Sequence, residues 1–249
     1  MKYRIEEAAR IIREASRTAA FTGAGISVES GIPPFRGTDG LWNTYDPSFL
    51  HIDFFRQNPE ESWELIRKIF YDCFGRARPN AAHYALAEME KQGRVQTVIT
   101  QNIDNLHHEA GSRCVYEFHG NSRKLVCQGC GSYYPVRETD FSFLPPRCGN
   151  CRAVLKPDFV FFGEPIPEGA ARLSFQEADD ADVFILIGTT GEVMPAALIP
   201  FEAKKKGKTI IEINIGPSQY TAAITDIFLR GKAASVMEEL STAIKQERQ

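Results

Sequence analysis

Six short apolar runs in this chain are each followed at once by small or polar residues, and this pattern restricts the fold more than any other feature. The unbroken run over residues 183–187 is typical of a strand that is buried on both faces of a parallel sheet. Helical patterns separate the runs, and this alternation predicts a doubly wound parallel α/β sheet, which binds ligands at the carboxyl ends of its strands. The residues that follow the runs are Gly23, Gln101, His119, Gly188, Asn214 and Gly231. We therefore expect an extended, dinucleotide-like ligand along this edge.

Two glycine-containing loops are candidates for binding phosphate. Residues 22–27 read Thr-Gly-Ala-Gly-Ile-Ser between a strand and a helix, and such small residues let backbone N–H groups approach an anion. The dinucleotide fingerprint Gly-x-Gly-x-x-Gly is incomplete, because Val28 stands where the third glycine is required. The second loop is residues 188–191. In the nearby loop 31–37, Phe35 and Arg36 either contact the ligand or simply anchor the loop and face solvent.

An amide-rich stretch and a histidine follow two neighbouring runs. Gln101, Asn102 and Asp104 come directly after the predicted strand 95–100, and burying them costs desolvation energy unless a ligand or a hydrogen-bond network satisfies them. The alternative is a polar turn in which Asn102 or Asp104 caps the next helix. His119 ends the predicted strand 115–118, and histidine can accept a proton near neutral pH. Because His119 shares this edge with the glycine turn and the amides, we interpret it as a general base.

Four of the six cysteines form two Cys-x-x-Cys pairs, at residues 127–130 and 148–151, separated by a span typical of a tetrahedral zinc site. Four thiolates leave no position for water or substrate, so we expect one structural zinc ion. The alternative is a pair of redox-active dithiols. The predicted ligands are Cys127, Cys130, Cys148 and Cys151.

Two further segments have ambiguous patterns. Residues 156–165 are a short apolar segment that is either a buried strand or an exposed edge to which a peptide adds as a strand. Residues 38–78 are rich in aromatics and contain a helical pattern around Trp63, which predicts an inserted helical module rather than one crossover helix. A further helix is expected from Asn80 to Lys91.

Composition and charge exclude some classes of function. A hydrophobic fraction of 43% is ordinary for a globular protein, and a formal net charge of -3 disfavours general binding to nucleic acid. The lysines at 204–206 are explained by the dipole and cap of a helix that begins at Pro195 better than by nucleic-acid binding. Apolar runs are too short to span a bilayer, and Glu6 and Glu7 stand where a signal peptide is apolar, so we expect a soluble, cytoplasmic protein without membrane partners.

Taken in order, these motifs resemble the sirtuins, the NAD-dependent protein deacylases. The matching stretches are residues 23–27, 30–37, 100–107, 119–120 and 188–190 together with the four cysteines, and they cover nearly the whole chain. The resemblance implies an inverted Rossmann-type large domain formed by residues 1–36, 79–121 and 158–249. A helical module (37–78) and a zinc module (122–157) would be inserted into it, with NAD lying between them and the sheet.

The resemblance also implies residue roles. Nicotinamide would leave NAD with its carboxamide held by Asn102, Ile103 and Asp104, and His119 would then deprotonate a ribose hydroxyl, so that the acyl group passes to ADP-ribose. The products would be free lysine, nicotinamide and O-acyl-ADP-ribose. The implied NAD contacts are Gly23, Ala24, Gly25, Phe35, Arg36, Gln101, Asn102, Ile103, Asp104, Gly188, Thr189, Thr190, Asn214 and Ala233. The implied peptide contacts are Val160, Phe161, Phe162, Gly163, Glu164 and Val193.

Departures from the family pattern bear on the substrate. Pro34 stands where many members have Asp, and Thr190 replaces the commoner Ser. The branch that removes succinyl groups carries a Tyr-x-x-Arg pair where Ile66 and Ile69 stand here, which favours acetyl-lysine proteins as partners, with chromatin proteins as one candidate class. Competing hypotheses are a desuccinylase, a mono-ADP-ribosyltransferase, and a non-catalytic sensor of NAD or ADP-ribose.

Overall fold

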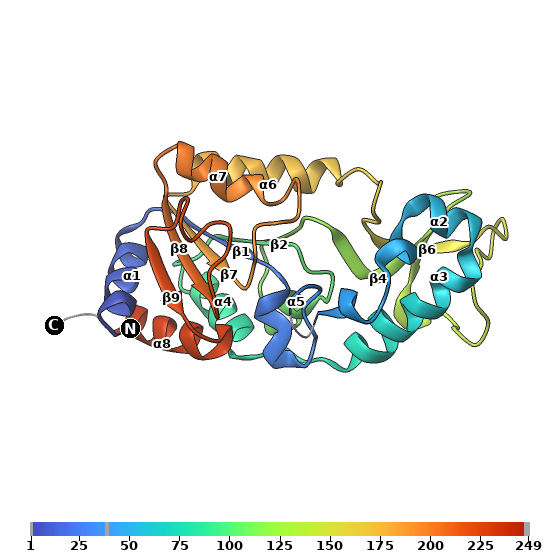
Figure 1. Cartoon of the computed structure of the whole chain (residues 1–249), viewed down its shortest axis with the longest axis horizontal. Helices are drawn as coiled ribbons and strands as arrows, with labels where there is room; N and C mark the ends of the chain where they lie inside the picture. The colour runs from blue at the N-terminus through green and yellow to red at the C-terminus, as the bar shows by residue number, and fades with distance from the viewer. Residues whose placement is uncertain (1, 38–39, 247–249) are drawn as a thin grey trace.

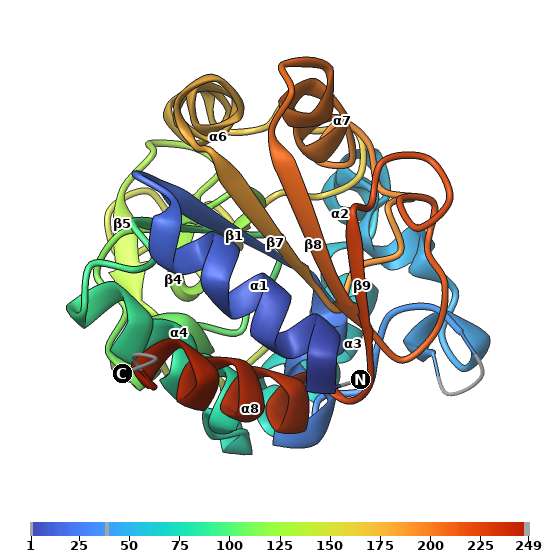
Figure 2. The same ribbon diagram turned by 90° about the vertical axis from the view of Figure 1, so that its left-hand side faces the viewer.

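A parallel sheet of six strands forms the centre of the larger of two lobes (Figures 1 and 2). The computed structural model describes residues 2–37 and 40–246; Thr38 and Asp39, which fall within the predicted helical module 37–78, lie outside these ranges. In sheet order the strands are β3 (Val115–Glu117), β2 (Thr97–Thr100), β1 (Thr18–Thr22), β7 (Val183–Ile187), β8 (Thr209–Asn214) and β9 (Ile227–Arg230). Strand order reverses between β1 and β7, so a crevice is expected outside the ends of these strands. The prediction of a doubly wound parallel sheet is confirmed.

Helices cover both faces of this sheet (Figure 2). One face packs on α1 (Lys2–Glu14), α4 (Ala81–Lys91) and α8 (Ala233–Lys245), and the other on α6 (Glu168–Asp180) and α7 (Leu198–Lys205). Because side chains alternate along a strand, neighbouring residues enter different cores. In β7, Ile185 joins the first core, whereas Phe184 and Leu186 join the second.

The smaller lobe combines two segments that are far apart in the sequence. An antiparallel sheet of three strands has the order β5 (Tyr133–Pro135), β4 (Gly120–Cys127) and β6 (Leu155–Phe159). It packs against α2 (Ile52–Gln57), α3 (Pro59–Ile66) and shorter helical turns at Leu41–Asn43, Pro47–Leu50, Arg67–Cys73 and Phe74–Arg76. Trp63 Nε1 donates a hydrogen bond to the Leu155 carbonyl over 2.8 Å. The zinc and helical segments therefore share one hydrophobic core. Figure 1 shows α2 and α3 beside β4 and β6.

Some element boundaries differ from the sequence-based expectations. The segment 156–165 is a strand only in part: β6 lies at an edge of the three-stranded sheet, where it pairs with β4 and ends at Phe159. Beyond it, Phe162 forms a single parallel bridge with His51. The helix expected from Pro195 begins at Leu198. Within the described part of the chain, no helix is both long and apolar enough to cross a bilayer.

The lysine run at 204–206 is engaged within the protein. Lys204 pairs with Asp226, Lys205 with Glu202, and Lys206 with Asp179. Helix α7 ends at Lys205, and Gly207 follows with a φ of 77°, as expected for a helix C-terminus. These contacts favour the interpretation of the lysines as helix-end cations.

Candidate active site

The two glycine loops meet at the carboxyl ends of β1 and β7. Gly25 donates its N–H to the carbonyl of Gly188 over 2.8 Å, and a Cβ on Gly25 would lie only 2.6 Å from the Gly188 Cα. Both positions therefore require glycine, because the two backbones touch. Gly25 lies in the first turn of a 3-10 helix, Ala24–Ser30. Val28 on this helix is 44% exposed to solvent. The missing third glycine therefore leaves this contact unaffected.

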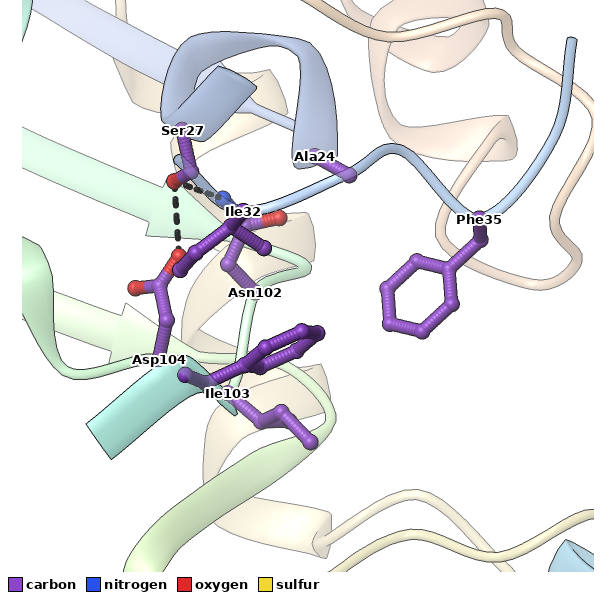
Figure 3. Close-up of a pocket in the computed structure, with 8 residues that line it drawn as sticks. Ala24, Ser27, Ile32, Phe35, Asn102, Ile103 and Asp104 are labelled. Carbon is purple, nitrogen blue, oxygen red and sulfur yellow. Dashed lines mark hydrogen bonds between the residues drawn. The ribbon is translucent and has the colours of Figure 1, made fainter. Parts of the chain in front are cut away.

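A small cavity lies beside this contact and contains the amide-rich stretch (Figure 3). Asn102 is buried, and its Nδ2 donates to the carbonyl of Gly23 over 3.1 Å and to Ser27 Oγ over 3.3 Å. Asp104 accepts from Ser27 Oγ over 2.6 Å with one oxygen and from the Leu106 N–H with the other. The cavity is lined by Ala24, Ser27, Ile32, Phe35, Phe74, Asn102, Ile103 and Asp104.

Asp104 both lines the cavity and belongs to the turn before the next helix. The bond from Leu106 makes Asp104 a turn residue at the start of α5 (Leu106–Ala110), while the bond from Ser27 fixes its other oxygen at the cavity. Burial raises the pKa of the Asp104 carboxyl, and the two hydrogen bonds oppose that rise.

Four residues in or beside the cavity were not predicted from the sequence: Ser27, Ile32, Phe74 and His83. His83 Nδ1 accepts from the Asn80 N–H, which leaves the Nε2 proton to point at Ser27 Oγ, 3.5 Å away. Burial lowers the pKa of His83 to about 4, so it is a neutral donor at pH 7. A Ser and a His on separate helical segments carry no local signal of this contact.

His119 has one ring nitrogen tied to the backbone. Its Nδ1 lies 3.0 Å from the carbonyl of Gln101, and because a carbonyl only accepts, Nδ1 carries the proton. Nε2 then has the free lone pair and is the basic nitrogen. Burial lowers the pKa of His119, and the Gln101 carbonyl opposes this shift, so the imidazole is neutral at pH 7. This is the protonation state that a general base requires.

Gln101 and Asn214 connect the two halves of the sheet edge through Thr189. Gln101 Nε2 donates to Thr189 Oγ1 over 3.1 Å, and Asn214 Nδ2 donates to the Thr189 carbonyl over 3.0 Å. Thr190 is exposed beside them, and Ala233 begins α8 at the far end of the edge, where the Glu29 carboxylate accepts from the next N–H. The structure therefore brings the predicted residues on β2, β7 and β8 to one edge.

The loop 31–37 reaches over the cavity from the side. The Phe35 ring lines the cavity and stacks 5.2 Å from Trp42, so it both anchors the loop and faces the site. Arg36 is half-exposed and pairs with Glu192 at 3.1 Å. This ion pair therefore connects the loop 31–37 to the segment that contains Val193.

The predicted peptide segment lies next to His119. Val160 donates its N–H to the His119 carbonyl over 2.8 Å. Phe161 is 1% exposed and packs on Phe55 and Phe159, so its side chain is closed to a ligand. Its N–H donates to the Glu164 carboxylate over 2.8 Å, and its carbonyl accepts from the Glu164 N–H over 3.0 Å. Phe162 and Gly163 are exposed beyond it, and Val193 is 36% exposed.

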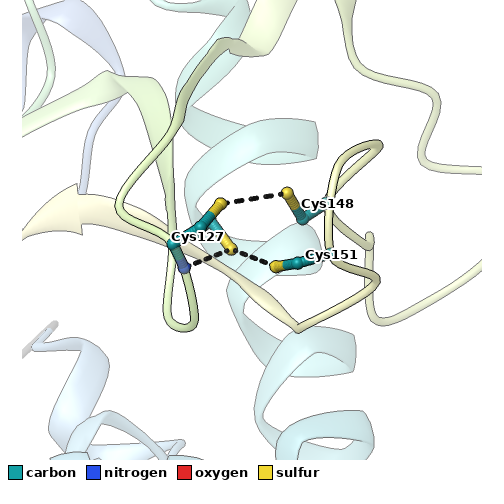
Figure 4. A group of neighbouring side chains, drawn as sticks. Cys127, Cys148 and Cys151 are labelled. Atoms are coloured by element: carbon teal, nitrogen blue, oxygen red, sulfur yellow. Dashed lines mark hydrogen bonds between the residues drawn. The ribbon is translucent and has the colours of Figure 1, made fainter.

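The four cysteines of the small lobe converge as the spacing predicts (Figure 4). Their sulfur atoms all lie within 4.8 Å of one another, with Cys127 3.4 Å from Cys151 and Cys130 3.6 Å from Cys148. Zn–S bonds of about 2.3 Å in a tetrahedron place sulfurs about 3.8 Å apart, close to these values. The sulfur atoms of the two pairs meet one another, as one shared metal ion requires and two independent redox dithiols do not. The site fits one zinc ion with no open coordination position.

Comparison with known proteins gives consistent matches over nearly the whole chain. The model of the Sir2 family matches residues 23–195. The NAD-dependent protein deacylase of Pyrococcus furiosus is 45% identical and the alignment covers 96% of this chain and 98% of that protein. The NAD-dependent protein deacetylase 1 of Pyrobaculum aerophilum is 44% identical, with coverage of 95% and 93%.

Solved structures give the same result. A mutant Sir2 homologue in complex with ADP-ribose superposes with a TM-score of 0.92 at 40% identity, with 96% of each chain covered. A Sir2 in complex with a p53 peptide and NAD+ superposes with a TM-score of 0.88 at 33% identity, with 95% and 96% covered.

Proposed function

This chain belongs to the Sir2 family and is an NAD-dependent protein deacylase, and on that premise we propose that it removes acetyl groups from lysine side chains with His119 as general base. The observation that carries this proposal is the fixed tautomer of His119 at the edge that holds the Asn102–Asp104 cavity. A site that only binds a nucleotide does not require a neutral imidazole with a free Nε2 there. The sensor hypothesis is therefore disfavoured.

NAD fits the edge as a co-substrate whose nicotinamide leaves the ribose before the acyl oxygen attacks. Asn102, Ile103 and Asp104 would hold the carboxamide in the cavity, where Ser27 fixes two of them. His119 Nε2 would accept the proton of a ribose hydroxyl, which then attacks the captured acyl carbon. The C–N bond to lysine would break, the lysine amine would leave with a proton, and water would add to give O-acyl-ADP-ribose. The backbones of Gly23–Gly25 and Gly188–Thr190 would meet the phosphates, with Arg36 and Phe35 over the cofactor and Asn214 and Ala233 at its adenosine half.

The preference for acetyl over succinyl is supported by the helical segment. Ile66 and Ile69 are both buried in the core of the small lobe, where they offer no charge to a carboxylate. The cations between them are engaged elsewhere: Arg67 donates to the Phe141 carbonyl, and Lys68 lies over the ring of Tyr45. An acyl chain ending in a carboxylate would therefore lack a partner from this segment.

We also propose three structural units and a cellular location. Residues 1–36, 79–121 and 158–249 would form the NAD-binding domain, with 37–78 as the helical module and 122–157 as the zinc module. The separate cores of the two lobes support a division into a large and a small unit, although Ile32, Ile103 and Phe161 pack in the core of the small lobe. Four metal-binding thiolates persist in a reducing compartment, which supports the cytoplasm, and acetylated proteins, chromatin proteins among them, would be the partners.

The decisive test is incubation of the protein with NAD and an acetyl-lysine or a succinyl-lysine peptide, followed by mass spectrometry. We expect free lysine and O-acetyl-ADP-ribose from the acetyl peptide, and little turnover of the succinyl peptide. His119→Ala should abolish deacylation. Nicotinamide release that continues without any acylated peptide would instead favour ADP-ribosyl transfer to another acceptor and would contradict the proposal.

A further inference from the structure

One lysine of the small lobe is buried, although lysine is almost never fully buried unless it is paired. Lys156 lies in β6 and is 3% exposed. Its Nζ donates to the carbonyls of Pro157 and Phe159 over 2.8 and 2.7 Å, and it lies 3.0 Å from Glu164 Oε2. Three acceptors thus meet the three protons of the ammonium, and the centroid of the Phe161 ring lies 4.1 Å away. Burial lowers the pKa of Lys156, and Glu164 opposes that shift.

Two of these partners, the carbonyls of Pro157 and Phe159, lie in β6, and the third, Glu164, ends the turn at residues 160–164 that follows this strand. The peptide group between Phe159 and Val160 is held on both sides, because its carbonyl accepts from Lys156 and its N–H donates to the carbonyl of His119. At the other end of the turn, the Glu164 oxygen that pairs with Lys156 also accepts from the Phe161 N–H over 2.8 Å. One ammonium therefore ties both ends of the turn together, next to the backbone of the base.

We propose that Lys156 is a positioning residue for deacylation: it holds the turn Val160–Glu164, which receives the acylated peptide, at a fixed distance from His119. This inference rests on the proposed function, since it takes this turn as the peptide site. Lys156 itself is too buried to touch the peptide. Its effect is therefore expected on peptide binding and orientation, with little effect on the binding of NAD to the glycine loops.

The test compares three lysine substitutions. Lys156→Met removes the charge and keeps the apolar stem, Lys156→Arg keeps the charge, and Lys124→Met makes the same change at an exposed lysine of the neighbouring strand β4. The measurements are KM for an acetyl-lysine peptide at saturating NAD, Kd for NAD by calorimetry without peptide, and the amide exchange rate of Phe161 in the peptide-free protein.

For Lys156→Met we expect KM to rise at least about tenfold, because removing one partner leaves Glu164 as an unpaired carboxylate. Exchange at Phe161 should accelerate, and Kd for NAD should stay within about twofold. Lys156→Arg should restore most of the loss, and Lys124→Met should match the wild type. Equal KM and exchange in Lys156→Met and Lys124→Met would overturn the proposal. So would an Arg variant as impaired as the Met variant, or a loss of NAD binding in parallel with peptide binding, which would indicate general destabilisation.

If Lys156→Met does not fold, Glu164→Gln decides, because it keeps an acceptor for the Phe161 N–H and removes only the negative charge. We expect a smaller rise in KM and faster exchange at Phe161; unchanged values would overturn the proposal. A wild-type protein without deacylase activity would contradict the proposed function, and the exchange rates would still show whether Lys156 holds the turn.

Discussion

The large lobe buries an apolar layer on each face of its sheet, whereas the small lobe has a single aromatic-rich core beside four cysteines. In the large lobe, strands β1, β7 and β8 are buried along almost their whole length and are covered by helices on both sides. In the small lobe, the knuckles around Cys130 and Cys151 are exposed, and β5 has only three residues. We infer that hydrophobic burial stabilises the large lobe by itself, whereas the small lobe also requires a metal.

This difference matches how the site is divided. The glycine contact and His119 lie at the edge of the large lobe, where they are held by hydrogen bonds to the backbone. The cavity lies between the lobes, because Phe74 of the small lobe lines it together with Asn102. The small lobe contributes Trp42, whose ring packs against Phe35. It also contributes β6, which leads into the turn proposed to bind the peptide. We infer that the large lobe stays folded when the small lobe unfolds.

Removal of zinc should have the largest effect and should test this division directly. Structural zinc contributes on the order of 10 kcal/mol to folding of small modules, so a chelator should unfold the small lobe. The chain has two tryptophans, Trp42 and Trp63, and both lie in this lobe. We expect their emission to shift to longer wavelength while most helical circular dichroism, which arises from α1, α4, α6 and α8, remains.

Two outcomes would break the comparison. Unchanged tryptophan emission after verified zinc loss would show that the aromatic core suffices without metal. A parallel loss of helical signal would show that the lobes unfold as one unit. Readdition of zinc to the chelated protein is the control for irreversible damage.

Trp63→Ala should give the next largest effect, because Trp63 joins the two segments of the small lobe. It is 0% exposed, stacks on Tyr71, packs against the tilted ring of Phe141, and donates a hydrogen bond to the Leu155 carbonyl. Truncation should cost about 3–5 kcal/mol and leave a carbonyl without its donor. We expect faster zinc release to a chromogenic chelator, with Trp42 reporting the looser core. Phe184→Ala, in the large lobe, is the matched control: a similar loss of stability there should leave zinc release nearly unchanged.

Local sequence patterns predicted those features of the fold and the site that depend on residues close together in the chain. The spacing of the four cysteines and the residues after each apolar run follow from turn geometry and strand direction, so the zinc site and the sheet edge were predicted from the sequence. The bond from Trp63 to Leu155 and the approach of His83 to Ser27 join residues that are distant in the chain. No local periodicity encodes such contacts, which is why the shared core of the small lobe and the supports of Asn102 and Asp104 were not predicted.

Acid should weaken the large lobe through its buried histidines. The pKa of His83 is about 4 in the folded protein against 6.5 for the free side chain. Below pH 6.5 the unfolded chain therefore binds a proton that the folded chain does not, so this contribution is complete above pH 6.5 and is lost as pH falls toward 4. The shift amounts to about 3 kcal/mol, and His107, whose pKa is also lowered by burial, acts in the same direction.

The measurement is urea unfolding followed by helical circular dichroism between pH 7 and pH 4.5. In His83→Gln the slope of stability against pH should be shallower, because one titrating group is gone. An identical slope in the variant would mean that His83 is solvated in the folded protein. Since thiolates also take up protons in acid, tryptophan emission must be followed in parallel to separate the small lobe.

Gly25→Ala should have the smallest effect on the free energy of unfolding and yet a large effect on NAD binding. It therefore separates the ligand site of the large lobe from the zinc site of the small lobe. The added Cβ would meet the Cα and carbonyl of Gly188 at 2.6 and 2.7 Å, both of them backbone atoms that cannot turn aside. The two loops must separate, at a cost of about 1–3 kcal/mol. Because the phosphates of NAD are expected where these loops touch, calorimetry should show NAD binding weakened far more than zinc binding.

Gly169→Ala is the control for that substitution. Gly169 lies exposed in the first turn of α6 with open space around its Cα, so the methyl should leave NAD binding unchanged and stabilise the helix by about 0.5–1 kcal/mol. Opposite signs are therefore expected from the same chemical change at two glycines of one lobe. If Gly25→Ala bound NAD as the wild type does, the close contact of the two loops would not be what shapes the phosphate site, and the rigidity assigned to the large lobe at this edge would be wrong.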